Sequence, residues 1–135
     1  MNMYTPATEP DVYQSYAQVL QAMAQPSRLR ILVTLIGGEA CVCHLESMLQ
    51  LRQAYLSQQL MVLRQAGLVQ QRREGKHIYY FLANPGLIPP ILKQVADQMG
   101  FETLTPGDPI QDPIPGCPCP TCIQASETLL LKATP

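Results

Sequence analysis

The sequence contains no stretch of about 18 consecutive apolar residues, the length from which a membrane-spanning helix is recognised, so we expect no membrane partner. Residues 1–10 contain neither a basic side chain nor an apolar segment, and a secretory signal peptide needs both. Charged residues are scarce, at 14% of the chain, but an apolar content of 47% is too high for a disordered protein. We therefore expect a globular, cytoplasmic protein whose 135 residues form one domain with tails.

The net charge of −1 provides no general attraction to nucleic acid, but the charges are unevenly distributed along the chain. Between Arg28 and Lys76 there are seven basic and three acidic side chains, a local net charge of +4, whereas the rest of the chain carries −5. A basic centre between acidic flanks is a modest electrostatic footprint for DNA binding. An ordinary solvated surface gives the same count, so the charge alone does not decide between the two.

Changes in composition divide the chain into an N-terminal tail at residues 1–10, a domain at 11–101 and a C-terminal tail at 102–135. Six prolines between Thr105 and Cys122 interrupt any regular pattern there. Proline lacks a backbone donor and restricts its neighbours, so this composition favours an extended tail.

Within the domain, the pattern of apolar residues changes from helical to strand-like spacing. The helical spacing predicts helices at residues 11–24, 26–36, 42–49, 53–66 and 87–99. Residues 68–72 and 76–82 are two short strand-like runs, and Gly75 suits the hairpin turn between them. The sequence therefore predicts a mainly α fold with a small β-hairpin. Its architecture would be a winged helix-turn-helix of about five helices and a two-stranded wing.

The five cysteines fall into two groups, Cys41 and Cys43 near the middle of the chain and three more in the C-terminal tail. In a reducing cytosol such groups indicate metal binding or redox chemistry rather than structural disulfides. The three tail cysteines are Cys117, Cys119 and Cys122.

Four segments resemble the ArsR/SmtB family of metal-sensing winged-helix repressors. Residues 26–32 (PSRLRIL) look like the start of its second core helix, and residues 41–45 (CVCHL) resemble its CVCDL metal-binding box, with His44 in place of aspartate. Residues 56–69 (LSQQLMVLRQAGLV) are similar to its recognition-helix signature, and residues 72–80 (RREGKHIYY) to its wing. The resemblance implies a homodimer joined by the first and last helices. It also implies repression of a detoxification or efflux operon that is relieved by metal.

The partner implied by the resemblance is double-stranded operator DNA. Polar side chains near the start of the fourth helix are expected to reach bases or phosphates, and basic side chains at the hairpin tip to reach phosphates or the minor groove. The helix residues are Gln53, Tyr55, Ser57, Gln58 and Gln59. The hairpin residues are Arg72, Arg73 and Lys76.

The expected effector is a soft ion held by cysteine thiolates, of the Cd(II), Pb(II), As(III) or Zn(II) class. The arsenite-sensing branch of the family often has a third cysteine where this chain has Glu46, and the cadmium/lead branch uses N-terminal cysteines, which do not occur before Cys41. Further ligands must then come from the tail cysteines. These complete the site of Cys41 and Cys43, form a separate thiolate site, or are redox-active or simply incidental, and the sequence leaves all three alternatives open.

The other common site of the family, on the last helix, uses aspartate, histidine and glutamate ligands. Here that region offers only Asp97 and Glu102, so we expect no zinc or nickel site of that kind. Three other functions remain as alternatives: a redox- or persulfide-sensing repressor of the same fold, a thiol oxidoreductase or arsenate reductase, and a metal-buffering or structural zinc module. Because no phosphate-binding loop or nucleophile motif lies near Cys41, we do not expect an enzyme.

Overall fold

The computed structural model describes most of the predicted domain and part of the C-terminal tail. The described residues are 11–100, Glu102, Cys117, Cys119, Pro120, 122–124 and Glu127. The predicted tail at 1–10 and most of the tail at 102–135 lie outside the described residues, so these boundaries stay predictions.

All five predicted helices are confirmed. They are α1 (Val12–Met23), α2 (Pro26–Ile36), α3 (Val42–Leu49), α4 (Gln53–Gln65) and α5 (Ile88–Met99). Asp11 caps α1 by accepting a hydrogen bond from the backbone N–H of Tyr13, and Pro26 begins α2, where its missing donor costs nothing. None of the helices in this part of the chain is long and apolar enough to cross a membrane.

The wing contains the two predicted strands, β2 (Val69–Glu74) and β3 (His77–Leu82), which pair antiparallel. A third strand, β1 (Ala40–Cys41), pairs antiparallel with the other edge of β3, so that the strand order is β1-β3-β2. The sequence analysis missed β1 because two residues are too few to show an alternating pattern. This short strand places Cys41 opposite Tyr79.

The core lies between the helices and one face of the sheet. Leu56, Leu60 and Leu63 of α4 are fully buried, as their spacing of three and four residues predicts. They pack with buried side chains of α2 and α3, including Ile31, Leu32 and Leu45. Because this packing holds α3 and α4 together as a helix-turn-helix, the exposed face of α4 has a fixed orientation relative to the wing.

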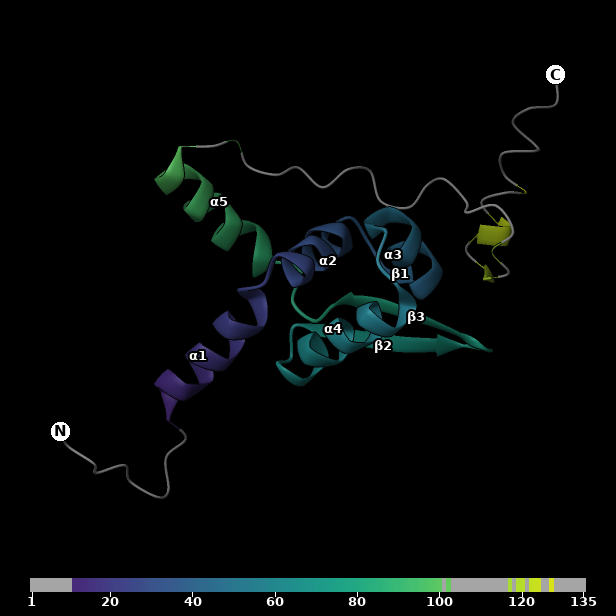
Figure 1. Cartoon of the computed structure of the whole chain (residues 1–135), viewed down its shortest axis with the longest axis horizontal. Helices are drawn as coiled ribbons and strands as arrows, with labels where there is room; N and C mark the ends of the chain where they lie inside the picture. Colours follow the sequence, from purple (N-terminus) through teal and green to yellow (C-terminus); the bar gives the residue numbers. More distant parts are fainter. Residues whose placement is uncertain are drawn as a thin grey trace.

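The helices α1 and α5 extend from the side of the molecule opposite the tip of the wing (Figure 1). Several large apolar side chains on these two helices remain exposed, in contrast to the buried leucines of α4. They are Val12, Tyr13, Tyr16, Leu20, Val95 and Met99.

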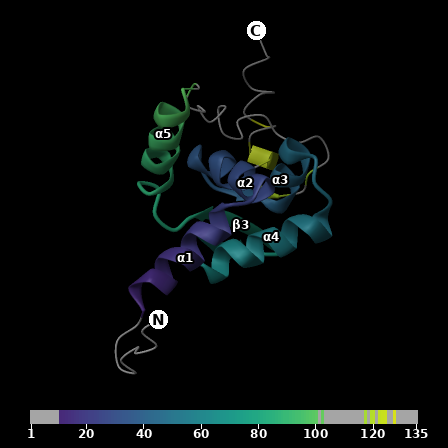
Figure 2. The ribbon, with the colours of Figure 1, turned by 60° about the vertical axis from the view of Figure 1, so that its left-hand side comes forward.

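The described part of the tail lies beside α3 and differs from the predicted extended conformation (Figures 1 and 2). Pro120 and residues 122–124 are helical, and the backbone N–H of Ile123 donates to the carbonyl of Cys119 at 3.0 Å. The extended conformation predicted for residues 105–122 is therefore wrong at Pro120 and Cys122. The physical reason is that proline is well tolerated in the first turn of a helix, where its backbone nitrogen needs no partner.

The buried face of α4 generates a stability prediction. Leu60→Ala removes a fully buried side chain and should lower the free energy of unfolding by about 2–5 kcal/mol. Met61→Ala is the matched control, because Met61 is 55% exposed and its loss should change stability by less than about 0.5 kcal/mol. Chemical denaturation at fixed protein concentration measures both, and equal effects of the two substitutions would contradict the packing described here.

Candidate metal centre and DNA-facing surface

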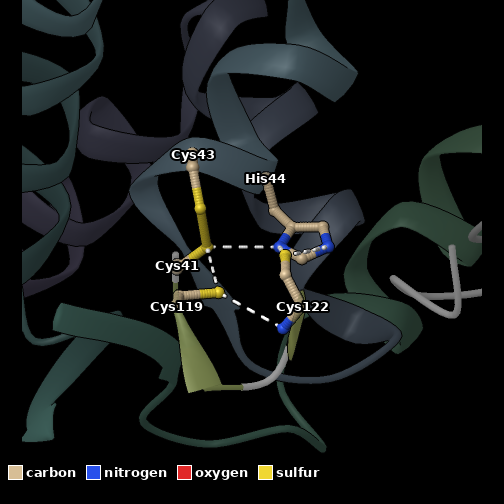
Figure 3. A group of neighbouring side chains, drawn as sticks. All are labelled: Cys41, Cys43, His44, Cys119 and Cys122. Carbon is tan, nitrogen blue, oxygen red and sulfur yellow. Dashed lines mark hydrogen bonds between the residues drawn. A yellow bond between two sulfur atoms is a disulfide. The ribbon is translucent and has the colours of Figure 1, made fainter. Parts of the chain in front are cut away.

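Five side chains with metal-binding atoms gather at one point beside α3 (Figure 3). Their ligand atoms all lie within 4.8 Å of one another, and the residues are Cys41, Cys43, His44, Cys119 and Cys122. The sulfur of Cys117 lies 2.7 Å from that of Cys43, at the edge of this group. We call these six residues the Cys/His cluster. The fold thus brings all five predicted cysteine ligands together, across 74 to 78 residues of sequence.

Two helix starts build the cluster. Cys41 ends β1 and is the N-cap residue of α3, and Cys43 and His44 lie in the first turn of that helix. On the opposite side, Cys119 precedes the helical residues of the tail, and the backbone N–H of Cys122 donates to its sulfur at 3.4 Å. N-cap positions have non-helical backbone angles, which lets their side chains turn toward the first turn of the same helix.

The distances within the cluster are short, and the side chains at its centre are buried. The Cys41 sulfur lies 3.2 Å from Nδ1 of His44 and 3.6 Å from the Cys119 sulfur. The Cys122 sulfur lies 3.6 Å from the same Nδ1 atom. These four side chains are buried, whereas Cys43 and Cys117 are half-buried at the rim.

Cys41 and Cys43 form a disulfide, with their Cα atoms 5.4 Å apart, and Cys117, Cys119 and Cys122 are not part of a disulfide. The structure therefore describes an oxidised form of the cluster. Because metal ions bind thiolates, two-electron reduction of this disulfide must precede the use of Cys41 or Cys43 as a ligand.

The microenvironment of Cys119 favours its ionised form. Burial raises the pKa of this thiol, but hydrogen bonds from the backbone N–H and side chain of Cys122, with smaller contributions from Cys117 and Tyr79, outweigh the burial. The net result is a pKa below the ordinary cysteine value. A lowered pKa increases the fraction of thiolate, which is the form that both metals and electrophiles require.

The cluster is connected to the wing through β1. Tyr79 of β3 lies opposite Cys41 and is buried among the cysteine side chains. The guanidinium group of Arg72 lies 4.4 Å above the Tyr79 ring, and its Nε donates to Glu39 at 2.8 Å. Hydrogen bonds from Arg72 lower the pKa of Glu39, against the effect of burial, and Glu39 in turn raises the pKa of Arg72. Cluster, sheet and wing therefore share one network of contacts.

A surface pocket of about 250 Å³ lies next to Cys41 and Cys43. It is also lined by Gln53, at the start of α4, and by Lys76 and His77 of the wing. The pocket is thus lined by two of the residues predicted to contact DNA, Gln53 and Lys76.

The predicted DNA-facing residues of α4 divide into two groups. Gln53, Ser57 and Gln58 are exposed, as a DNA contact requires. Tyr55 is half-buried, and its hydroxyl bonds with Gln25 and Ser27 of the neighbouring helix start. The structure gives these hydroxyl contacts a role in holding α4 against α2.

Gln59 differs most from the prediction, because it is buried and its side-chain oxygen accepts a hydrogen bond from Arg28 at 3.0 Å. It follows Gln58 by one residue, and neighbouring positions on a helix point about 100° apart, so one glutamine faces solvent and the other faces the interior. Its side chain packs inside the protein and is not presented for base recognition.

On the wing, Arg73 and Lys76 are exposed, and Gly75 at the turn has φ +61°, a conformation that favours glycine. Arg72 is engaged by Glu39, Glu74 and the Tyr79 ring, so its charge is partly compensated. The sequence analysis omitted Arg52, which is exposed at the N-cap of α4. Its position directly before the recognition helix was the available signal.

The sequence analysis also missed His44 as a ligand candidate, treating it only as a substitution within the cysteine box. The signal was its spacing of three residues from Cys41, which places both side chains on the same side of a helix start. On α5, Asp97 accepts a hydrogen bond from Lys93 at 2.6 Å, and the expectation about a site there stays a prediction.

Comparison with known proteins places these features in a family. Residues 25–71 match the family model described as "Bacterial regulatory protein, arsR family". The chain is 52% identical over 67 residues to the biofilm growth-associated repressor of Agrobacterium fabrum, covering 50% of this chain and 57% of that protein. It is 37% identical over 89 residues to a transcriptional repressor SmtB homolog of Synechocystis, covering 66% and 67% of the two chains. The match thus spans little more than half of the first of these relatives.

A solved structure shows the same fold. The homodimeric winged helix-turn-helix DNA-binding domain of a possible ArsR-family transcriptional regulator from Mycobacterium bovis has a TM-score of 0.61 and 30% sequence identity. The match covers 70% of this chain and 93% of that one. It confirms the predicted fold class, a winged helix-turn-helix.

The burial of the three thiols outside the disulfide, Cys117, Cys119 and Cys122, predicts their order of alkylation. Without reductant, iodoacetamide should modify half-buried Cys117 at least about tenfold faster than Cys119 or Cys122, which are at most 1% exposed. The lowered pKa of Cys119 should not reverse this order, because a buried sulfur reacts only after local opening. Time-resolved mass spectrometry of the alkylated peptides measures the three rates, and modification of Cys119 or Cys122 first would contradict the geometry.

Proposed function

The chain belongs to the arsR family of bacterial regulatory proteins, and from this premise we propose that it is a transcriptional repressor controlled by a soft metal or metalloid ion. It binds operator DNA as a homodimer and releases the DNA when cysteine thiolates of the Cys/His cluster bind the ion. The observation that carries the proposal is the convergence of Cys41 and Cys43 with the tail cysteines at the start of α3. This position touches both elements that face DNA.

The DNA-binding half of the proposal rests on α4 and the wing. The exposed side chains Gln53, Ser57 and Gln58 lie near the N-terminus of α4, where glutamine matches the hydrogen-bonding pattern of adenine in the major groove. Arg73 and Lys76 extend the same surface along the hairpin and supply charge for phosphate contacts. The cation Arg52 adds to this surface at the start of α4.

The homodimer is supported by the exposed apolar side chains of α1 and α5. Tyr13 is 81% exposed and Met99 is 68% exposed, which is costly for a pair of helices facing water. A second copy packed on these helices would bury both. The resulting two-fold symmetry would present two α4 helices to two half-sites of an operator.

The release of DNA requires a physical connection between the ion and the DNA-facing residues, and two connections are available. Cys41 pairs with Tyr79 across β1 and β3, and the Tyr79 ring contacts Arg72 on the wing. Through the other route, α3 packs directly on α4 in the helix-turn-helix. A bound ion would hold the start of α3 and the tail in one arrangement. A shift of β1 or α3 would then turn the wing and α4 away from their positions on DNA.

The donor set fits such an ion. Sulfur donors and one imidazole suit thiophilic ions such as Zn(II) and Cd(II), and the half-buried rim leaves an entry path beside Cys43. Because thiolates and neutral imidazole must release protons to bind a metal, ion affinity should fall as the pH is lowered.

The decisive experiment is operator binding by the reduced protein with and without Zn(II), Cd(II), Pb(II) or arsenite. The operator is a fragment selected from random DNA by the reduced, metal-free protein. We expect at least one of these ions to weaken DNA binding by about 5–150-fold, the usual range of coupling free energies. The variant Cys41→Ser/Cys119→Ser should bind DNA as the wild type does but respond to none of the ions. A variant that still releases DNA would show that the cluster is not the sensor.

The wing generates a second prediction. Arg73→Ala and Lys76→Ala should each weaken binding to all DNA sequences and should each reduce the slope of log affinity against log salt by about 1. Lys93→Ala is the control. This substitution also removes one positive charge, but Lys93 lies on α5, away from the wing. Titrations at several salt concentrations measure the slopes. A slope that is reduced equally by the control, or unchanged by the wing variants, would argue against phosphate contacts at the wing.

A redox-sensing repressor is the second candidate, and the Cys41–Cys43 disulfide is the observation that favours it. In this case two thiols lose two electrons and two protons to a peroxide, which is reduced to water, and the disulfide alters the start of α3. DNA retention measured with peroxide and with metal separates the candidates. A redox sensor releases DNA with peroxide alone and loses this response in Cys43→Ser, whereas a metal sensor responds to the ion under reducing conditions.

A further inference from the structure

The two helix starts of the cluster present their donors with the same spacing. Cys41 and His44 are the N-cap and third residue of α3, and Cys119 and Cys122 are likewise three residues apart around the start of the tail helix. A pair of ligands separated by two residues is the usual unit of tetrahedral zinc sites, and two such units supply four ligands. Cys43 is not three residues from Cys41 or from His44, so it does not follow this spacing.

Three of the six distances among these four donors are close to the edges of a tetrahedron around one ion, and the other three are within 4.8 Å. Zinc–sulfur bonds of about 2.3 Å and zinc–nitrogen bonds of about 2.0–2.1 Å give tetrahedral edges of about 3.8 Å between sulfurs and about 3.5 Å between sulfur and nitrogen. The Cys41–Cys119 sulfur distance is 3.6 Å. The distances from Nδ1 of His44 to the sulfurs of Cys41 and Cys122 are 3.2 and 3.6 Å. Figure 3 shows the four donors pointing toward a common centre.

Burial separates the same four donors from the remaining two cysteines. Cys41, His44, Cys119 and Cys122 are each at most 3% exposed, as in a closed site without an open coordination position. Cys43 and Cys117 are half-buried and lie beside each other, with their sulfurs 2.7 Å apart.

We propose that Cys41, His44, Cys119 and Cys122 form one closed tetrahedral site for a divalent ion of the zinc and cadmium class, with Cys43 and Cys117 outside it. This proposal rests on the proposed function, because it names the ligand set and ion class of the same cluster. It replaces the five-cysteine ligand set expected from the sequence with three thiolates and one imidazole.

In this ligand set, His44 determines how strongly the site prefers a tetrahedral divalent ion over arsenite. A tetrahedral divalent ion uses the imidazole as its fourth ligand, whereas arsenite is satisfied by the three thiolates alone. Removing the imidazole should therefore weaken zinc binding and leave arsenite binding almost unchanged. The disulfide has a separate consequence, because it takes Cys41 out of the ligand set, so the oxidised protein should not bind zinc tightly.

The experiment is a metal titration of the reduced, full-length protein without DNA, using Co(II) as the spectroscopic probe and Zn(II) competition for affinity. The wild type should bind one Co(II) per chain with the spectrum of a tetrahedral site containing three thiolates. His44→Ala and Cys41→Ser should each weaken zinc binding by at least about 100-fold. Cys43→Ser and Cys117→Ser should change neither the spectrum nor the affinity.

Two further variants control for folding and for the identity of the histidine. His44→Cys keeps a ligand at this position, so it should restore a tetrahedral spectrum with one additional thiolate. His77→Ala removes the other histidine, which lines the pocket beside Cys43, and should have no effect. If His44→Ala fails to fold, His44→Cys against wild type still tests the ligand, because only a directly bound residue changes the thiolate count.

Equal losses of affinity in Cys43→Ser and Cys41→Ser would overturn the proposal, and so would an unchanged spectrum in both His44 variants. The outcome is independent of DNA release. A protein that binds Co(II) as described but does not release the operator would refute the proposed function and leave this site intact. A protein that releases the operator but binds the ion through a different ligand set would support the proposed function and refute this site.

Discussion

The contact between the tail cysteines and the start of α3 is the interaction on which the account depends. The domain does not need it for its core, because the leucine-rich cluster of α2, α3 and α4 is separate from the small cluster of Cys41, Tyr79, Cys119 and Cys122. Under the proposed function, the strength of this contact between sulfur and imidazole groups depends on a bound ion and on the oxidation state of the cysteines. The core of the domain and the contact with the tail are then separate, and only the contact responds to the ion.

The position of this junction explains how its state could reach DNA. Cys41 is at once the last residue of β1, the cap of α3 and a member of the cluster. Because β1 contains only two residues and pairs with β3, a displacement of Cys41 would be passed directly to β3. The ring of Tyr79 and the guanidinium group of Arg72 lie directly beyond it, on the wing.

The sequence predicted the helices and the hairpin well, because long apolar periodicities and the turn at Gly75 are local signals. From residue type and grouping alone it predicted that the five cysteines act together, and their sulfurs do lie close to one another in the structure. It did not predict β1, which is too short to show a period, or the burial of Gln59, which depends on its contact with Arg28 in α2. The spacing of His44 from Cys41 was visible in the sequence, but its contact with Cys122, 78 positions away, was not, and the proposed ligand role of His44 rests on both.

The central claim is that the cluster and the DNA-facing surface share one conformational equilibrium. Thermodynamic linkage makes this claim measurable as the Zn(II) affinity of the reduced protein with and without bound operator. The account predicts that operator weakens zinc binding, and that the factor equals the factor by which zinc weakens operator binding. A zinc affinity that is the same in the free and DNA-bound protein would contradict it, whatever the ligand set.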